Sequence, residues 1–122
     1  MNKKPITVLL LLMSLTISNW IFAEKLEGRQ KPLTREEQVL AKKAKLSFAD
    51  AKKKALEKVP GEIFNWELEM EEGKIIYSFE IELPNDKKYS REVDVDAMTG
   101  KIIEVDKEDL KTQKENAKNP SR

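Results

Sequence analysis

The strongest pattern in the chain is a strict alternation of apolar and polar residues in two neighbouring segments, residues 63–71 and 75–83. Such alternation predicts two half-buried β-strands, and Glu72-Gly73 between them is a two-residue turn signal. Pairing Glu71 with Lys74 brings the large apolar residues of both strands together on one face. The predicted pairs are Met70 with Ile75, Leu68 with Tyr77, Trp66 with Phe79, and Phe64 with Ile81.

A third strand is predicted at residues 88–96, after a turn signal at residues 84–87. We expect a three-residue loop, because a two-residue loop would set Phe79 against Glu92 and mix the apolar and polar faces. The same register brings two carboxylates opposite each other, which is mildly unfavourable. The predicted pairs are Leu83 with Tyr89, Phe79 with Val93, and Glu80 with Glu92.

A fourth strand follows a turn at residues 96–101, which Asp96 caps and in which Gly100 takes a positive φ. The apolar residues of this strand are Ile102, Ile103 and Val105. Residues 107–122 have no core-forming pattern, so we expect a disordered polar tail.

The region before the strands has helical periodicity. One helix is predicted from the start signal at Ser47 to the stop at Pro60-Gly61, with an apolar side formed by Phe48, Ala51, Ala55, Leu56 and Val59. Residues 24–46 form either a charged linker or a short helix, which Thr34 and Glu37 would begin as a capping box. The apolar stripe of that helix is thin, so it would dock loosely or fray; it consists of Val39, Leu40 and Ala44.

These patterns together predict an α+β fold, in which one main helix packs on a four-stranded antiparallel meander sheet. The domain would span residues 47–106, with Trp66 near the centre of its core. A domain of this size buries little surface and is expected to be marginally stable.

Residues 1–23 have the features of a secretory signal peptide: a basic start, an apolar run and a small residue at the end. Cleavage is expected at Ala23/Glu24, which predicts a periplasmic or secreted protein without a stable membrane anchor. The alternative is an uncleaved anchor. A spanning helix needs about 20 mostly apolar residues, and here the run is interrupted by Ser14, Thr16, Ser18 and Asn19.

The composition excludes most catalytic chemistry. The chain has no His and no Cys, which removes the usual catalytic triads, zinc hydrolysis, haem ligation and disulfides. Without Lys3 and Lys4 the chain carries 23 − 2 = 21 basic and 22 acidic residues, a net charge of −1, and it has no basic stripe for nucleic acid. We therefore expect a protein that is not an enzyme and has no cofactor.

Several motifs of this chain occur in the same order as in a known protein family, over about half of the chain. They are Leu46-Ser47-Phe48-Ala49-Asp50-Ala51, Val59-Pro60-Gly61, the two alternating strands, and the closing segment from Val93 to Ile103, which contains Asp96-Ala97-Met98-Thr99-Gly100-Lys101. The chain thereby resembles the PepSY domain family. The resemblance implies an extracytoplasmic module of the kind found in peptidase propeptides and as free-standing envelope proteins, proposed to inhibit or regulate peptidases. Since no peptidase domain follows, we do not expect a zymogen.

The candidate interaction face is acidic. Six carboxylates share the outward face of the predicted sheet: Glu67, Glu69, Glu80, Glu82, Glu92 and Asp94. They would either receive a basic partner or a cation, or form an ordinary solvated face with Lys nearby. A calcium loop starting at Asp94 fails, because its fifth and twelfth positions are Met98 and Val105. The three Lys residues at 52–54 are interpreted as part of the solvent-exposed side of the helix.

Our leading functional hypothesis is a non-enzymatic exported binding module that inhibits or regulates an extracytoplasmic peptidase or sensor. It would act by strand addition or through its sheet face. The alternative is a protein that binds a small ligand or divalent cation on the acidic face. We predict no catalytic residues, no bound metal and no nucleic-acid partner.

Overall fold

The computed structural model describes residues 31–119. The predicted signal peptide, its cleavage site and residues 120–122 lie outside the described residues. Within residues 31–119 no helix is long and apolar enough to cross a membrane.

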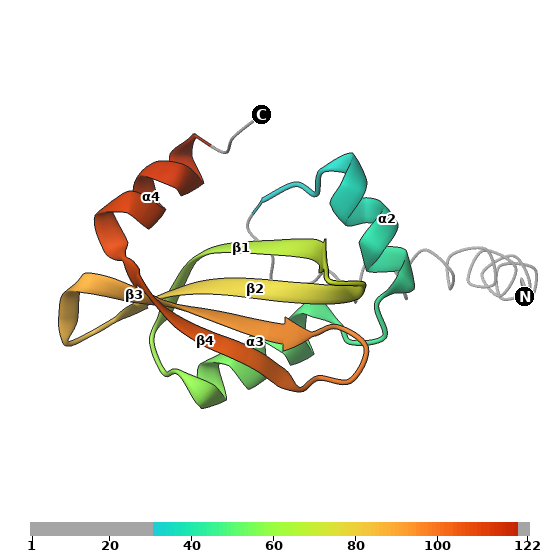
Figure 1. Cartoon of the computed structure of the whole chain (residues 1–122), viewed down its shortest axis with the longest axis horizontal. Coiled ribbons are helices and arrows are strands. Elements are labelled where there is room, and N and C mark those ends of the chain that lie inside the picture. The colour runs from blue at the N-terminus through green and yellow to red at the C-terminus, as the bar shows by residue number, and fades with distance from the viewer. Residues whose placement is uncertain (1–30, 120–122) are drawn as a thin grey trace, which may run out of the picture.

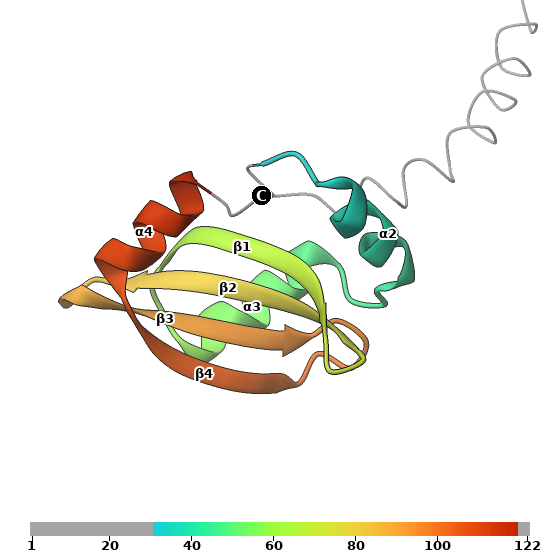
Figure 2. The ribbon, with the colours of Figure 1, turned by 45° about the horizontal axis from the view of Figure 1, so that its top comes forward.

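The described chain folds into three helices and one sheet. In order, the elements are α2 (Arg35–Lys43), α3 (Phe48–Lys58), β1 (Glu62–Glu71), β2 (Lys74–Leu83), β3 (Asp86–Asp96), β4 (Ile102–Asp109) and α4 (Leu110–Lys118). The strands pair antiparallel in the order β1-β2-β3-β4. Helix α3 packs on β2 and β3 and lies behind the sheet in Figures 1 and 2. This is the predicted α+β meander.

The core lies between α3 and the sheet. Phe48, Ala51 and Ala55 of α3 are buried, and the two small alanines let the helix approach the strands closely. The Phe48 ring lies 4.5 Å from the Trp66 ring and 5.7 Å from the Phe79 ring, between centroids. The predicted central position of Trp66 is thus confirmed.

The register of β1 with β2 is confirmed over three of the four predicted pairs, and the fourth is wrong. Ile63, not Phe64, lies opposite Ile81, because a β-bulge inserts Phe64 into β1. The residue before β1 approaches β2 closely here: a Cβ on Gly61 would collide with the carbonyl oxygen of Glu82. Phe64 instead lies below the Lys114 ammonium of α4, 5.7 Å from ring centroid to Nζ.

The pairing of β2 with β3 follows the prediction except at its loop. Phe79 lies opposite Val93, and Glu80 opposite Glu92. The predicted pair of Leu83 with Tyr89 is wrong, because Leu83 lies opposite Asp86. The Asp86 carboxylate accepts hydrogen bonds from the backbone amides of Lys88 and Tyr89, at 3.1 and 3.0 Å, and this local turn changes the register.

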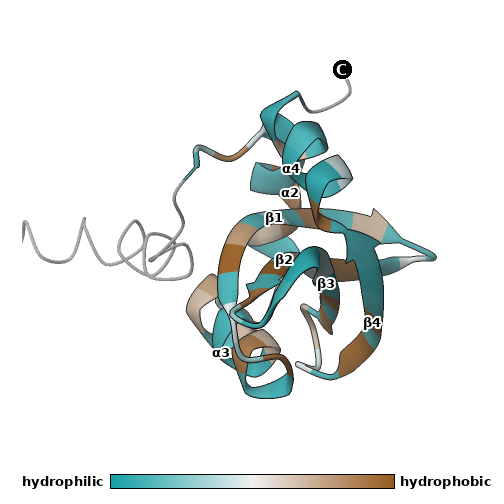
Figure 3. Ribbon diagram, turned by 90° about the vertical axis from the view of Figure 1, so that its left-hand side faces the viewer, coloured by the Kyte–Doolittle hydropathy of each residue, from teal (hydrophilic) through white to brown (hydrophobic). Residues whose placement is uncertain are grey.

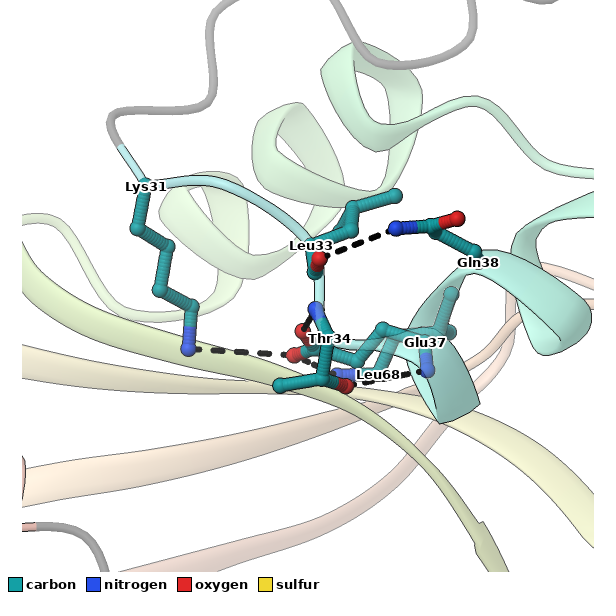
Figure 4. Close-up of polar contacts among 6 residues, drawn as sticks. All are labelled: Lys31, Leu33, Thr34, Glu37, Gln38 and Leu68. Carbon is teal, nitrogen blue, oxygen red and sulfur yellow. Dashed lines mark hydrogen bonds and ion pairs between the residues drawn. The ribbon is translucent and has the colours of Figure 1, made fainter.

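Of the two alternatives for residues 24–46, the structure shows the short helix, α2, and this helix is docked on β1. Its capping box is complete: the Thr34 hydroxyl accepts from the Glu37 amide, and the Glu37 carboxylate accepts from the Thr34 amide at 2.8 Å. Leu40, Ala41 and Ala44 are buried, whereas Val39, placed on the apolar side in the prediction, is 49 % exposed. Glu37 also accepts from the Leu68 amide of β1 at 3.5 Å (Figure 4). These polar bonds to β1 supplement the thin apolar stripe.

The expectation of a disordered tail is wrong for residues 107–118. Strand β4 continues to Asp109, whose carboxylate accepts from the Thr112 amide at 3.0 Å and caps α4. Leu110 is 6 % exposed, and the Lys114 ammonium lies 2.7 Å from the Glu82 carboxylate. The helix buries one large apolar side chain and is otherwise held by polar contacts, so it leaves little hydrophobic pattern in the sequence.

Candidate acidic interface

The face of the sheet opposite α3 carries carboxylates from all four strands. The strand registers align them in rows across the sheet: one row runs Asn65, Glu80, Glu92, Asp106, and the next runs Glu67, Ser78, Asp94, Glu104. A third row contains Glu82, Ser90 and Glu108. We call this surface the acidic face; its carboxylates are Glu67, Glu69, Glu71, Glu80, Glu82, Glu92, Asp94, Glu104, Asp106 and Glu108.

All six residues predicted from the sequence lie on the acidic face, but their exposure differs. Glu67 is exposed, and Glu69, Glu82 and Glu92 are partly buried. Glu80 and Asp94 are only 7 % and 6 % exposed. The two central strands therefore hold carboxylates in a largely desolvated setting, which differs from an evenly solvated sheet face.

The centre of the acidic face is a carboxyl pair. Glu80 and Glu92 lie directly opposite each other on β2 and β3, and the Ser90 hydroxyl donates to Glu80 at 3.5 Å. Burial raises the pKa of Glu92 to about 8, with further contributions from its hydrogen bond to Glu80 and from the Glu80 charge. Burial also raises the pKa of Glu80. Two carboxyl groups directly opposite each other disfavour joint ionisation, so the pair retains a proton to higher pH than an ordinary Glu does.

Asp94 is the second desolvated acid. Burial raises its pKa, and the neighbouring Glu71 and Asp106 charges raise it further, against a hydrogen bond from Ser78 that lowers it. Within residues 31–119 its Oδ1 atom is buried and accepts no hydrogen bond. Buried polar atoms are satisfied in most native structures, so this oxygen is an unsatisfied buried acceptor, which is destabilising.

Cations are scarce on the acidic face. Glu82 pairs with Lys114 at 2.7 Å and with Lys87 at 3.8 Å, at one end of the sheet. Of the carboxylates at the middle of the face, none has a Lys or Arg nitrogen within 4.0 Å in the described part of the chain. The carboxylates at the middle of the face are therefore not paired with a cation of the described chain.

The acidic face has no preformed metal site: in residues 31–119 no three acidic side chains are grouped so that they could hold an ion. A cavity of about 280 Å³ lies elsewhere, on the α3 side of the sheet, lined by Lys31, Phe48, Lys52, Ile63, Phe64, Asn65, Trp66 and Ala117. Glu80 and Glu92 do not line this cavity.

Four carboxylates of the acidic face escaped the sequence reasoning: Glu71, Glu104, Asp106 and Glu108. Glu71 and Glu104 continue the same alternation and were within reach of it. Asp106 and Glu108 were missed because β4 was expected to end near residue 106. Ile76 and Ile102 are buried and partly buried, so neither adds an exposed apolar patch.

The comparisons with known proteins give one match. The family model described as "Peptidase propeptide and YPEB domain", PepSY, matches residues 45–106, which is half of the chain. No curated protein and no solved structure matches the chain. The family resemblance drawn from the sequence motifs is thereby confirmed.

Proposed function

Since the chain belongs to the PepSY family, we propose that it is an exported, non-enzymatic binding module that regulates an extracytoplasmic peptidase or sensor. It does so by receiving a basic segment of that partner on the acidic face. The observation that carries this proposal is the group of carboxylates at the middle of the acidic face, none of which has a Lys or Arg nitrogen within 4.0 Å in the described chain.

Electrostatics supports a basic macromolecular partner. Desolvated like charges on one surface destabilise the free protein, and a Lys or Arg placed among them relieves that repulsion. The exposed carboxylates Glu67, Glu104 and Asp106 are the positions that an incoming cation reaches directly.

The proposed location follows from the signal-like segment at residues 1–23 and from the extracytoplasmic setting that the family implies. The absence of catalysis is inferred from the lack of His and Cys and from the family. Intact mass of the protein from host fractions tests the location: a mass matching residues 24–122 in the soluble envelope fraction supports export. A full-length mass in the membrane pellet contradicts a cleaved signal.

The function is tested by co-purification from an envelope extract. The tagged wild-type protein should recover a specific protein, and the variant Glu67→Lys with Glu69→Lys should recover at least several-fold less of it. The control variant, Glu57→Lys with Glu115→Lys, has the same net charge but changes exposed positions on α3 and α4. Equal recovery by both variants, or no specific protein recovered by folded wild-type bait, would contradict the proposal.

A further inference from the structure

The two edges of the sheet are unlike. Strand β1 is one edge, and α2 packs beside it. There the Glu37 carboxylate accepts the hydrogen bond of the Leu68 amide, and the Lys31 ammonium lies 3.8 Å from the same carboxylate (Figure 4). The Glu37 side chain thus accepts the hydrogen bond of an amide that another strand would otherwise bind, so α2 obstructs this edge.

The opposite edge, β4, is open. In the described chain β4 pairs with β3 alone, and Figure 3 shows β1 and β4 on opposite sides of the curved sheet. Residues 103–107 are all exposed, including the apolar Ile103 and Val105 at 39 % and 37 %. An exposed edge strand presents unpaired amides and carbonyls, and it is a template for one more strand.

The chemistry of β4 differs on its two sides. Glu104 and Asp106 lie opposite Asp94 and Glu92 and continue the acidic face, whereas Val105 lies opposite the core residue Val93 on the α3 side. Any strand added beside β4 would repeat this alternation, because successive side chains point to opposite faces. One side of that strand would meet carboxylates, and the other would meet Val105.

A second copy of this chain is a poor occupant of the edge. Two β4 strands paired edge to edge would bring acidic side chains of both copies onto one surface, and like charges opposite each other destabilise a strand pair. The carboxylates of β4 therefore act against self-association while they favour a basic strand.

We propose that the β4 edge of this protein accepts an extended partner segment in which Lys or Arg alternates with apolar residues. The basic side chains face Glu104, Asp106 and the rest of the acidic face, and the apolar side chains cover Val105. This inference rests on the proposed function, since it names the part of the basic partner that binds and the way in which it binds.

The test uses four synthetic peptides with the purified protein. The first alternates three Lys with three Val residues between terminal Gly residues. The second has the same composition with Lys and Val in two blocks. The third and fourth are the alternating sequence with N-methyl groups on every second backbone amide, one in each of the two possible frames. Affinity is measured by fluorescence anisotropy, and hydrogen exchange of the β4 amides is followed by NMR.

We expect the alternating peptide to bind roughly tenfold more tightly than the blocked peptide. N-methylation in one frame should weaken binding by about tenfold, and in the other frame it should change it little, because only alternate amides of an added strand point to the sheet. The outward amides of residues 103–107 should become protected. Glu104→Lys with Asp106→Lys should weaken binding by about tenfold, while Glu57→Lys with Glu115→Lys should have a small effect.

Several results would overturn the inference. One such result has three parts: the alternating and blocked peptides bind equally, the two N-methyl frames are equivalent, and only Glu67→Lys with Glu69→Lys weakens binding. Strand addition is then refuted, although the proposed function stands. If no peptide binds and co-purification also fails, both proposals fail together. If the protein itself dimerises and Val105→Lys abolishes the dimer, the edge belongs to a second copy.

Discussion

The carboxyl pair of Glu80 and Glu92 predicts that this domain loses stability as the pH rises through the neutral range. The perturbation is Glu92→Gln, which keeps the size of the side chain and its hydrogen-bonding capacity but removes the titration. The pKa of Glu92 is about 8 in the folded protein, against an ordinary value of 4.5. Between these two values the native state binds a proton that the unfolded state has lost, so the free energy of unfolding falls as pH rises.

The size of the effect follows from the burial of the side chain. Each pKa unit corresponds to about 1.4 kcal/mol of difference between folded and unfolded states. Since Glu92 is only half-buried, solvent screening removes much of this, and we expect a contribution of about 1–2 kcal/mol. That stabilisation is complete below pH 4.5 and is lost as the pH approaches and passes 8.

The assay is urea unfolding monitored by the fluorescence of the buried Trp66, at intervals from pH 5 to pH 9. Glu92→Gln should match the wild type near pH 5 and exceed it by about 1–2 kcal/mol near pH 8. Burial also raises the pKa of Asp94 and Glu69, so a shallower slope of the same sign remains in the variant. Glu57→Gln on the exposed side of α3 serves as the control. Parallel curves for the wild type and Glu92→Gln would refute the retention of a proton by the pair of Glu80 and Glu92.

Two further substitutions test the core and the C-terminal helix. Trp66→Ala should lower the free energy of unfolding by roughly 3–5 kcal/mol, because the indole packs on Phe48; an intact near-UV circular dichroism spectrum would contradict its central position, with Trp66→Phe as the milder control. Leu110→Ala should lower the stability by about 2–3 kcal/mol and speed hydrogen exchange in α4 more than in β2. Equal exchange of α4 amides in variant and wild type would show that the helix is not docked through this side chain.

The sheet was predictable where side chains alone decide the structure. The alternation in β1 and β2 specifies which face is buried, and matching Trp66 with Phe79 leaves one register that keeps the apolar residues together. The errors occur where backbone groups decide. The bulge at Phe64 lies beside the close approach of Gly61 to β2, and the loop register depends on two amides bound by Asp86. No hydrophobic pattern records such contacts.

The position of the acidic face was predictable from the sequence, but the burial of its central carboxylates was not. Alternation placed Glu80 and Asp94 on the outward face, where an isolated strand would leave them in water. Their burial depends on the neighbouring strands and side chains, so it could not be deduced from the period of the sequence. Helix α4 was missed for a related reason: it buries one large apolar residue, Leu110, and its cap and ion pair are polar.

The two faces of the same strands therefore have opposite effects on stability. Phe79 and Val93 stabilise the domain from the α3 side, while Glu80 and Glu92, the residues that follow and precede them in the chain, crowd carboxyls on the other side. A small domain has little stability to spare. Replacing Glu92 by Gln would be a simple way to remove the repulsion between the carboxyl groups of Glu80 and Glu92. An arrangement that weakens the free protein becomes favourable once a cation from outside completes it, and this is the strongest physical reason to regard the acidic face as a binding surface.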